Sequence, residues 1–147
     1  MKIKGVWFYG YSGSGKTYSS KYLSKFIKHP FIIDGDDIRK NISYDLGYDE
    51  YDRIVQTKRV LGLAKITIAQ KFFPIISTSY LNSDIAKKGT SVGILVVQII
   101  RNKKHLNVIK FKGNILGSDI KLDSFKVKKI INDHNIKIKI KSLIDLF

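Results

Sequence analysis

Apolar residues fall into two kinds of pattern along the chain. Short apolar runs, too brief for helices, predict buried strands. These runs occupy residues 6–10, 31–33, 73–77 and 92–100. Longer stretches, with apolar residues near helical spacing or helix-compatible residues after an acidic start, predict helices. They cover residues 16–28, 36–41 and 53–71, and Pro74 is expected to close the last of them.

The order of these elements favours an α/β fold, because strands alternate with helical segments. Such chains build a mostly parallel sheet, and ligands bind beyond the carboxyl ends of its strands. The chain has 147 residues and no linker, repeat or low-complexity block, so residues 1–147 are expected to form a single domain. Residues 135–147 are ambiguous: the isoleucines alternate like a strand, whereas the last residues suit a helix.

Composition removes several classes of function. Hydrophobic residues make up 44% of the chain and aromatic residues 12%, which is typical of a globular protein. Cysteine is absent, so disulfides, thiolate metal sites and a cysteine nucleophile are excluded. We expect no signal peptide, because the apolar stretch near the start, residues 6–9, is too short. We expect no membrane partner, because the longest apolar run, residues 92–100, is about half the length that spans a bilayer. A cytoplasmic location is therefore expected.

The charge balance indicates an anionic partner of some kind. The formal net charge is +15, from 27 Lys and Arg against 12 Asp and Glu. Most of the excess is lysine spread over the second half, as at Lys137, Lys139 and Lys141, without a compact stripe of arginine and aromatic residues. A solvated basic surface is therefore expected rather than nucleic-acid binding. Polyanion binding and steering of phosphorylated substrates stay open as alternatives.

The most specific motif is GYSGSGKT at residues 10–17, which fits G-x-x-x-x-G-K-[ST] between a predicted strand and a predicted helix. Its glycines let backbone N–H groups turn toward one anion, and the helix N-terminus adds its dipole. The motif predicts ATP and Mg²⁺ as cofactors, and a P-loop NTPase-like three-layer sandwich with a mostly parallel central sheet. The predicted nucleotide-binding residues are Gly10, Ser12, Gly13, Ser14, Gly15, Lys16 and Thr17.

An acidic segment, DGDDIR at residues 34–39, follows the second predicted strand. Its carboxylates and Arg39 should lie at the sheet edge that holds the P-loop. A carboxylate there can accept the proton of an attacking hydroxyl or help to hold Mg²⁺, and Arg39 can pair with a phosphate or sulfate group. Alone, the segment would suit an acidic helix cap with a solvated arginine. The P-loop upstream favours phosphoryl transfer instead.

Three stretches, in this order and spacing, resemble adenylylsulfate kinase. They are WFYGYSGSGKT at residues 7–17, IDGDDIR at residues 33–39, and DLGY at residues 45–48 followed by Asp52 and Arg53. The similarity extends over residues 5–64 and is much more specific than the P-loop by itself. It implies transfer of the ATP γ-phosphate to the 3′-hydroxyl of adenosine 5′-phosphosulfate, a small nucleotide, in sulfate assimilation.

The resemblance also implies roles for individual residues. Asp36 matches the candidate general base, and Lys16 and Asp34 complete the predicted catalytic set. Thr17 and Asp34 are the predicted metal ligands. The predicted substrate-binding residues are Arg39, Tyr48, Arg53, Gln56, Ser79, Lys104 and Ile115. The two arginines would grip the phosphosulfate and Tyr48 would stack on the base, although a half-buried tyrosine without a ligand is an equal alternative.

Several positions of the chain depart from the family pattern. Gln56 stands where the family has asparagine, and residues 77–82 replace an Ile-Ser-Pro segment, so that Ser79 is only a weak match. The lid region after residue 101 is shortened, and Ile115 stands where many members have a second stacking aromatic. Such changes favour a different acceptor, slower turnover or loss of activity as alternatives.

Three hypotheses follow from these observations. The first is adenylylsulfate kinase activity. The second is a related kinase that acts on another small nucleotide, such as cytidine diphosphoramidate. The third is a catalytically impaired nucleotide-binding module. A homodimer is left open in each case.

Overall fold

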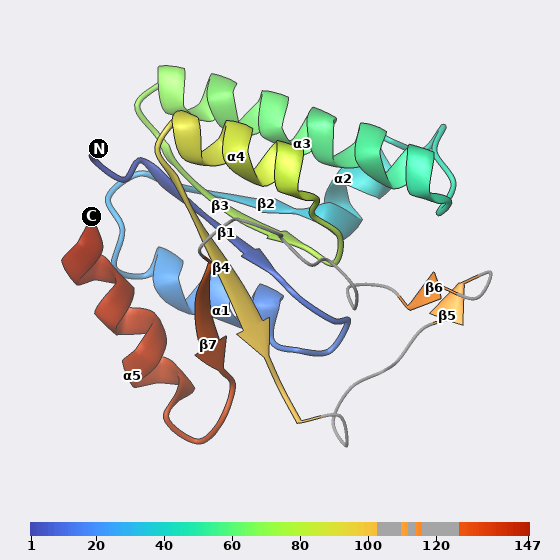
Figure 1. The fold of residues 1–147 in the computed structure, drawn as a ribbon. Coiled ribbons are helices and arrows are strands. Elements are labelled where there is room, and N and C mark those ends of the chain that lie inside the picture. The colour runs from blue at the N-terminus through green and yellow to red at the C-terminus, as the bar shows by residue number, and fades with distance from the viewer. Residues whose placement is uncertain (103–109, 112–113, 116–126) are drawn as a thin grey trace.

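A five-stranded sheet forms the centre of the protein, which we describe from a computed structural model covering residues 1–102, 110–111, 114–115 and 127–147 (Figure 1). Its strand order is β2-β3-β1-β4-β7, and every neighbouring pair is parallel. The strands are β1 (Gly5–Tyr9), β2 (Pro30–Asp34), β3 (Phe73–Thr78), β4 (Ile94–Ile100) and β7 (Lys128–Ile131). Two short strands, β5 (Lys110–Phe111) and β6 (Asn114–Ile115), form a separate antiparallel pair. The predicted α/β fold with a parallel sheet is confirmed.

Helices cover both faces of the sheet, which makes three layers (Figure 1). One face carries α2 (Gly35–Asn41), α3 (Glu50–Ala69) and α4 (Ser83–Ser91). The other carries α1 (Lys16–Ser24), α5 (Ile136–Lys141) and the 3₁₀ helix η2 (Ser142–Leu146). Within the described part of the chain, none of these helices has the length and apolarity needed to cross a membrane.

Several predicted helix ends differ from the structure. The helix α1 stops at Ser24, four residues before the predicted end. In α3 the start lies earlier than predicted, because the side chain of Asp49 accepts a hydrogen bond from the backbone N–H of Asp52 and caps the helix at Glu50. The expectation that Pro74 closes this helix was wrong: Pro74 lies inside β3, and the chain leaves the helix through Lys71, whose φ is 66°.

The sequence pattern did not predict α4 or β7, and it left the C-terminal segment open. The structure makes that segment helical, with Ile136, Ile140 and Leu143 buried and Ile138 turned to solvent. The strand β7 was missed because it lies at the edge of the sheet, and a four-residue strand with lysines and one buried isoleucine has little apolar signal. The expectation that β2 is buried was wrong, because β2 is the strand at the opposite edge of the sheet and exposes Phe31.

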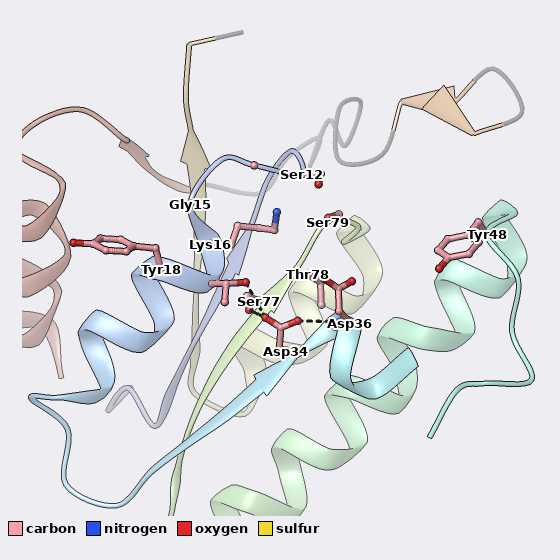
Figure 2. A pocket seen from close by; sticks show the side chains of 13 residues that line it. Ser12, Gly15, Lys16, Tyr18, Asp34, Asp36, Tyr48, Ser77, Thr78 and Ser79 are labelled. Atoms are coloured by element: carbon pink, nitrogen blue, oxygen red, sulfur yellow. Dashed lines mark hydrogen bonds between the residues drawn. The ribbon is translucent and has the colours of Figure 1, made fainter. Parts of the chain in front are cut away.

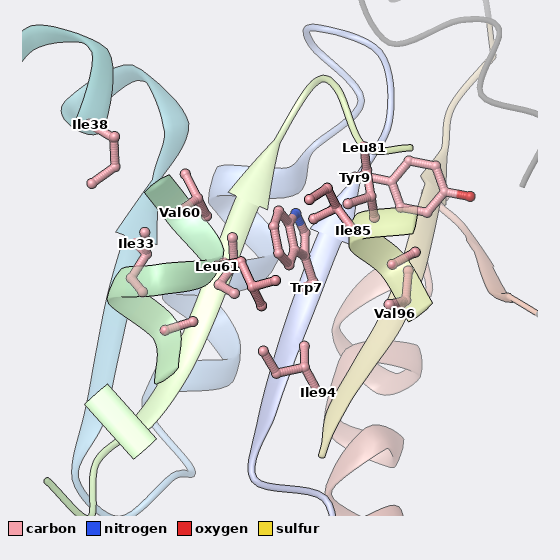
Figure 3. Close-up of a cluster of buried hydrophobic side chains, with 13 residues drawn as sticks. Trp7, Tyr9, Ile33, Ile38, Val60, Leu61, Leu81, Ile85, Ile94 and Val96 are labelled. Atoms are coloured by element: carbon pink, nitrogen blue, oxygen red, sulfur yellow. The ribbon is translucent and has the colours of Figure 1, made fainter. Parts of the chain in front are cut away.

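The central strand β1 packs against both helical layers. Its side chains alternate: Trp7 and Tyr9 join the cluster under α3 and α4 (Figure 3), while Val6 and Phe8 join the cluster against α1 and α5. Burying one such side chain contributes about 1.5–3 kcal/mol. The Trp7 indole also donates a hydrogen bond to Thr78 Oγ1 at 2.8 Å, which ties the end of β3 to β1. The carboxyl ends of these strands are thereby fixed side by side.

Candidate active site

The loop between β1 and α1 takes its shape from glycines. Gly13 and Gly15 have φ values of 80° and 101°, a left-handed region that side chains other than glycine rarely adopt. Gly15 is the N-cap of α1, and the first turn of that helix contains no acidic residue. The helix dipole and the free N–H groups at this end are therefore available to an anion such as phosphate.

Lys16, the first residue of α1, is held inside the loop. Its side chain is 8% exposed, and Nζ donates a hydrogen bond to the carbonyl oxygen of Tyr11 at 2.7 Å. Burial lowers the pKa of Lys16 to about 8, although the carboxylates of Asp36 and Asp34 act in the opposite direction. Lys16 is thus a desolvated cation whose charge interacts with both acidic residues.

Asp34 links the P-loop to the acidic segment (Figure 2). Its Oδ2 accepts hydrogen bonds from Thr17 Oγ1 at 2.8 Å and from Ser77 Oγ at 3.1 Å. Its Oδ1 accepts from the backbone N–H of Asp36 at 2.9 Å, so that Asp34 also caps α2. Residues from α1, β2, α2 and β3 therefore meet at one carboxylate.

The donors at this point suit Mg²⁺. The hydroxyl of Thr17 and the carboxylate of Asp34 are hard oxygen ligands in contact with each other. The described residues contain no group of three or more His, Cys, Asp or Glu side chains that could hold a metal unaided. Mg²⁺ fits this arrangement because it usually takes one or two protein oxygens and completes its shell with water and substrate phosphates.

These side chains line one cleft of about 500 Å³ (Figure 2). Asp36 enters it from the first turn of α2, opposite the P-loop. The lining residues are Ser12, Gly13, Gly15, Lys16, Thr17, Tyr18, Asp34, Gly35, Asp36, Tyr48, Ser77, Thr78 and Ser79. The structure thus brings together most of the residues predicted for nucleotide, metal and catalysis. Their individual roles stay predictions.

Two of the predicted loop residues support the cleft from behind. A side chain on Gly10 would meet the carbonyl oxygen of Ile99 at 2.4 Å, so only glycine fits between β1 and β4 there. Ser14 is fully buried, and its backbone N–H bonds to the carbonyl of Tyr11 at 3.1 Å. These residues shape the loop, and the cleft surface comes from their neighbours.

A second cavity, of about 80 Å³, opens beside the first and shares its Asp36, Tyr48 and Ser79. Arg39 lines it with its guanidinium 4.3 Å from the centre of the Tyr48 ring, a cation–π contact. The same guanidinium donates to the carbonyl oxygen of Gly47 at 2.8 Å. Arg39 and Tyr48, predicted separately as an anion ligand and a base platform, therefore form one packed unit.

Arg53 and Gln56 line the second cavity from one face of α3. Arg53 is 5% exposed, and its buried Nε and Nη2 atoms have no hydrogen-bond partner among the described residues. Gln56 donates from Nε2 to the carbonyl of Gly35 at 3.1 Å, while its buried Oε1 likewise lacks a partner there. Burial, followed by the charge of Arg39, lowers the pKa of Arg53. A buried cation with unsatisfied donors is suited to an anionic ligand.

Two predicted substrate residues cannot be placed. Lys104 lies outside the described residues, and of Ile115 only the backbone, in β6, is described. Other contributors were missed. Ser77 binds Asp34, Arg101 donates to the Gly13 carbonyl at 3.2 Å, and Asn132 donates to the Ser14 carbonyl at 2.8 Å. Prediction of β7 would have indicated Asn132, because the residue after a parallel strand lies at the ligand-binding edge.

Comparison with known proteins identifies the family. The model of the family described as adenylylsulphate kinase matches residues 2–83, more than half of the chain. The chain belongs to the adenylylsulphate kinase family. The sequence resemblance drawn from the P-loop and the acidic segment is thereby confirmed, and the matched range covers β1 through β3, which carry every paired side chain around Asp34.

Individual relatives match over part of their length. An adenylyl-sulfate kinase of Pseudomonas entomophila is 37% identical over 65 residues, which cover 42% of this chain and 31% of that protein. One from Bacteroides thetaiotaomicron is 30% identical over 91 residues, covering 59% of this chain and 45% of that protein. The chain thus matches less than half of the length of these curated relatives.

Solved structures support the fold. The Mycobacterium tuberculosis APS kinase CysC, solved in complex with AMPPNP and APS, aligns over 99% of this chain and 97% of that chain, with a TM-score of 0.75 and 22% identity. A gluconokinase from Sinorhizobium meliloti aligns over 96% of this chain and 90% of that chain, with a TM-score of 0.62 and 15% identity. Because structures with such different names share this fold, the fold alone does not choose the acceptor.

Proposed function

We propose that the chain is an ATP-dependent kinase that phosphorylates the ribose 3′-hydroxyl of adenosine 5′-phosphosulfate. The observation that carries this proposal is the hydrogen bond from Thr17 to Asp34 in a cleft that also holds Lys16 and Asp36. It joins a phosphate-binding loop to the carboxylates that phosphoryl transfer requires. Family membership supports the choice of reaction.

The donor phosphates bind at the P-loop. Lys16 exchanges the Tyr11 carbonyl for phosphate oxygens, and the N–H groups at the start of α1 bind the same anion. Thr17 and Asp34 would hold Mg²⁺, which would neutralise charge on the phosphates. Burial of Lys16 strengthens its attraction for them, because the local dielectric is low.

The acceptor lies against Arg53 and the Arg39–Tyr48 unit. The unpaired Nε and Nη2 of Arg53 donate to the phosphosulfate, and the Tyr48 ring offers a face to the base. The ribose 3′-oxygen attacks the γ-phosphorus, a new P–O bond forms, and the bond to the β,γ-bridging oxygen breaks to release ADP. Asp36, exposed at the cleft, accepts the hydroxyl proton.

ADP formation with ATP and Mg²⁺ against several acceptors tests this proposal. Adenosine 5′-phosphosulfate should be turned over much faster than cytidine diphosphates, with one ADP formed for each acceptor consumed. Faster turnover of a cytidine nucleotide would replace the proposed acceptor. ATP binding that depends on Lys16, without ADP formation on any acceptor, would refute kinase activity and favour a nucleotide-binding module.

A further inference from the structure

The carbonyl groups of the P-loop are held from outside by side chains that come from distant parts of the chain. Asn132, directly after β7, donates from Nδ2 to the carbonyl oxygen of Ser14 at 2.8 Å. Arg101, directly after β4, donates to the carbonyl oxygen of Gly13 at 3.2 Å. Both residues lie beyond the range that matches the family model.

The contact with Asn132 fixes the direction of one peptide group. In a trans peptide the C=O of one residue and the N–H of the next point in opposite directions. No cis peptide occurs in the described residues, so the group joining Ser14 to Gly15 is trans. With its carbonyl oxygen bonded to Asn132, this group directs the N–H of Gly15 away from Asn132, and Gly15 is one of the residues that line the cleft.

Close packing makes this arrangement specific. A side chain on Gly15 would place its Cβ 2.4 Å from Asn132 Nδ2, so the amide occupies the space directly against the loop. Asn132 is itself held, because its backbone N–H donates to the carbonyl of Ile100 at 2.7 Å. Lys139 anchors the same turn, binding the Ile131 carbonyl at 3.1 Å and Asp133 Oδ2 at 2.6 Å.

We infer that Asn132 is a positioning residue for phosphate binding: it holds the Ser14–Gly15 peptide so that the Gly15 N–H faces the phosphates. This inference rests on the proposed function of the P-loop. It gives the residue directly after β7 a role in the donor site, although that residue lies outside the P-loop motif. An amide is suited to the position, since its N–H₂ can donate to the carbonyl.

Calorimetric titration of the chain with Mg²⁺-ADP and with inorganic tripolyphosphate tests the inference. Asn132→Ala should weaken binding of both by about 2- to 12-fold, the effect of one neutral hydrogen bond. Asn132→Asp keeps the shape but turns a donor into a negative acceptor, so the loss should be larger. Asn135→Ala, in the same turn, is the matched control and should bind like the parent chain.

The outcomes separate the inference from the proposed function. Tripolyphosphate has no base or ribose, so an equal loss for both ligands points to the phosphate cradle. If the parent chain binds tripolyphosphate through Lys16 and Asn132→Asp binds it with the same affinity, the inference about Asn132 is overturned and the proposed function is not. A parent chain that binds neither ligand would refute the proposed function instead. Melting temperatures of the variants show whether a loss of binding reflects unfolding.

Discussion

The proposed site has a donor half, around Lys16, Thr17 and Asp34, and an acceptor half, around Arg53, Gln56 and the Arg39–Tyr48 unit. The two halves differ in whether their charged side chains have hydrogen-bond partners. In the donor half, the charged side chains of Lys16 and Asp34 and the hydroxyl of Thr17 have hydrogen-bond partners at 2.7–3.1 Å, whereas the buried hydroxyl of Ser14 has none among the described residues. In the acceptor half, buried donors of Arg53 and the buried Oε1 of Gln56 have none among the described residues. Unsatisfied buried groups cost stability, and a ligand that pairs with them recovers that cost.

This contrast distinguishes the part of the site that is proposed to bind ATP from the part that is proposed to bind the acceptor. The proposed donor half is built mainly from segments around β1, β2 and α1, with Arg101 and Asn132 bonded to the P-loop from outside, and Lys16, Thr17 and Asp34 are already paired before any ligand binds. The proposed acceptor half depends on α3 and on the Arg39–Tyr48 unit, and the Nε and Nη2 donors of Arg53, which have no partner among the described residues, suit an anionic ligand. The acceptor half should therefore be tunable in affinity without loss of ATP binding, and the predictions below test that separation.

The largest effect is expected from Asp36→Asn. This change removes the proposed proton acceptor, so the rate of transfer should fall by about 10²- to 10⁴-fold. ATP affinity should change little, because Asp36 makes no proposed contact with the base or sugar of ATP. Single-turnover ADP formation and ATP titration measure the two quantities. Asp37→Asn, its neighbour on α2, is the control, and equal losses in both variants would remove Asp36 from the mechanism.

Replacement of Arg53 by methionine should separate acceptor binding from stability. Loss of charged hydrogen bonds to the phosphosulfate should raise the KM for the acceptor by about 12- to 160-fold, while the Kd for ATP stays constant. The free protein should melt at a higher temperature, because an unpaired buried charge has been removed. A lower melting temperature with an unchanged KM would show that Arg53 is a structural residue.

Nucleotide affinity should fall at alkaline pH through Lys16. The free chain loses this charge near its pKa of about 8, whereas bound phosphates favour the charged form, so the Kd for ATP should rise about tenfold between pH 7 and pH 9. In Lys16→Met, which lacks this amine, affinity should be low and show no such trend. Titrations in buffers of different ionisation enthalpy would detect the proton taken up on binding.

The lowered pKa of Lys16 also makes the stability of the fold depend on pH. Because the folded-state value lies below the ordinary 10.5, the unfolded chain binds more protons between pH 8 and pH 10.5. Burial of Lys16 therefore opposes folding below about pH 8, and this contribution is relieved as the pH rises toward 10.5. The free energies of unfolding of the parent chain and of Lys16→Met, measured by denaturant titration, should therefore become more similar as the pH rises across that window.

The smallest effect is expected at Arg59. Its guanidinium forms a bidentate pair with Asp45 at 2.6 and 2.9 Å, at the surface of the loop that precedes Tyr48. The pair holds the pKa of Asp45 below its ordinary value, so its contribution is present at neutral pH and is lost in acid. Arg59→Met should lower the melting temperature slightly at pH 7 and leave acceptor KM within about twofold. A larger KM effect would extend the acceptor half to this loop.

Local sequence was sufficient to predict the P-loop and Asp34 in the donor half. The P-loop is contiguous, and Asp34 could be located because it ends a strand of the same parallel sheet as β1, whose carboxyl end leads into the P-loop. The contact between Arg39 and Tyr48 was not predictable, since it depends on how the chain turns between α2 and α3. Asn132 was missed for another reason: β7 is short and half polar, so its pattern does not reveal which residue follows it.

Phosphorus NMR of the 147-residue chain with ATP, Mg²⁺ and adenosine 5′-phosphosulfate tests the central claim most directly. If the two halves meet at one reactive phosphorus, a new phosphomonoester on the ribose 3′-oxygen should appear as ADP accumulates in equal amount, and Asp36→Asn should abolish both signals. Release of ADP with inorganic phosphate, or ATP that stays intact beside a bound acceptor, would contradict it.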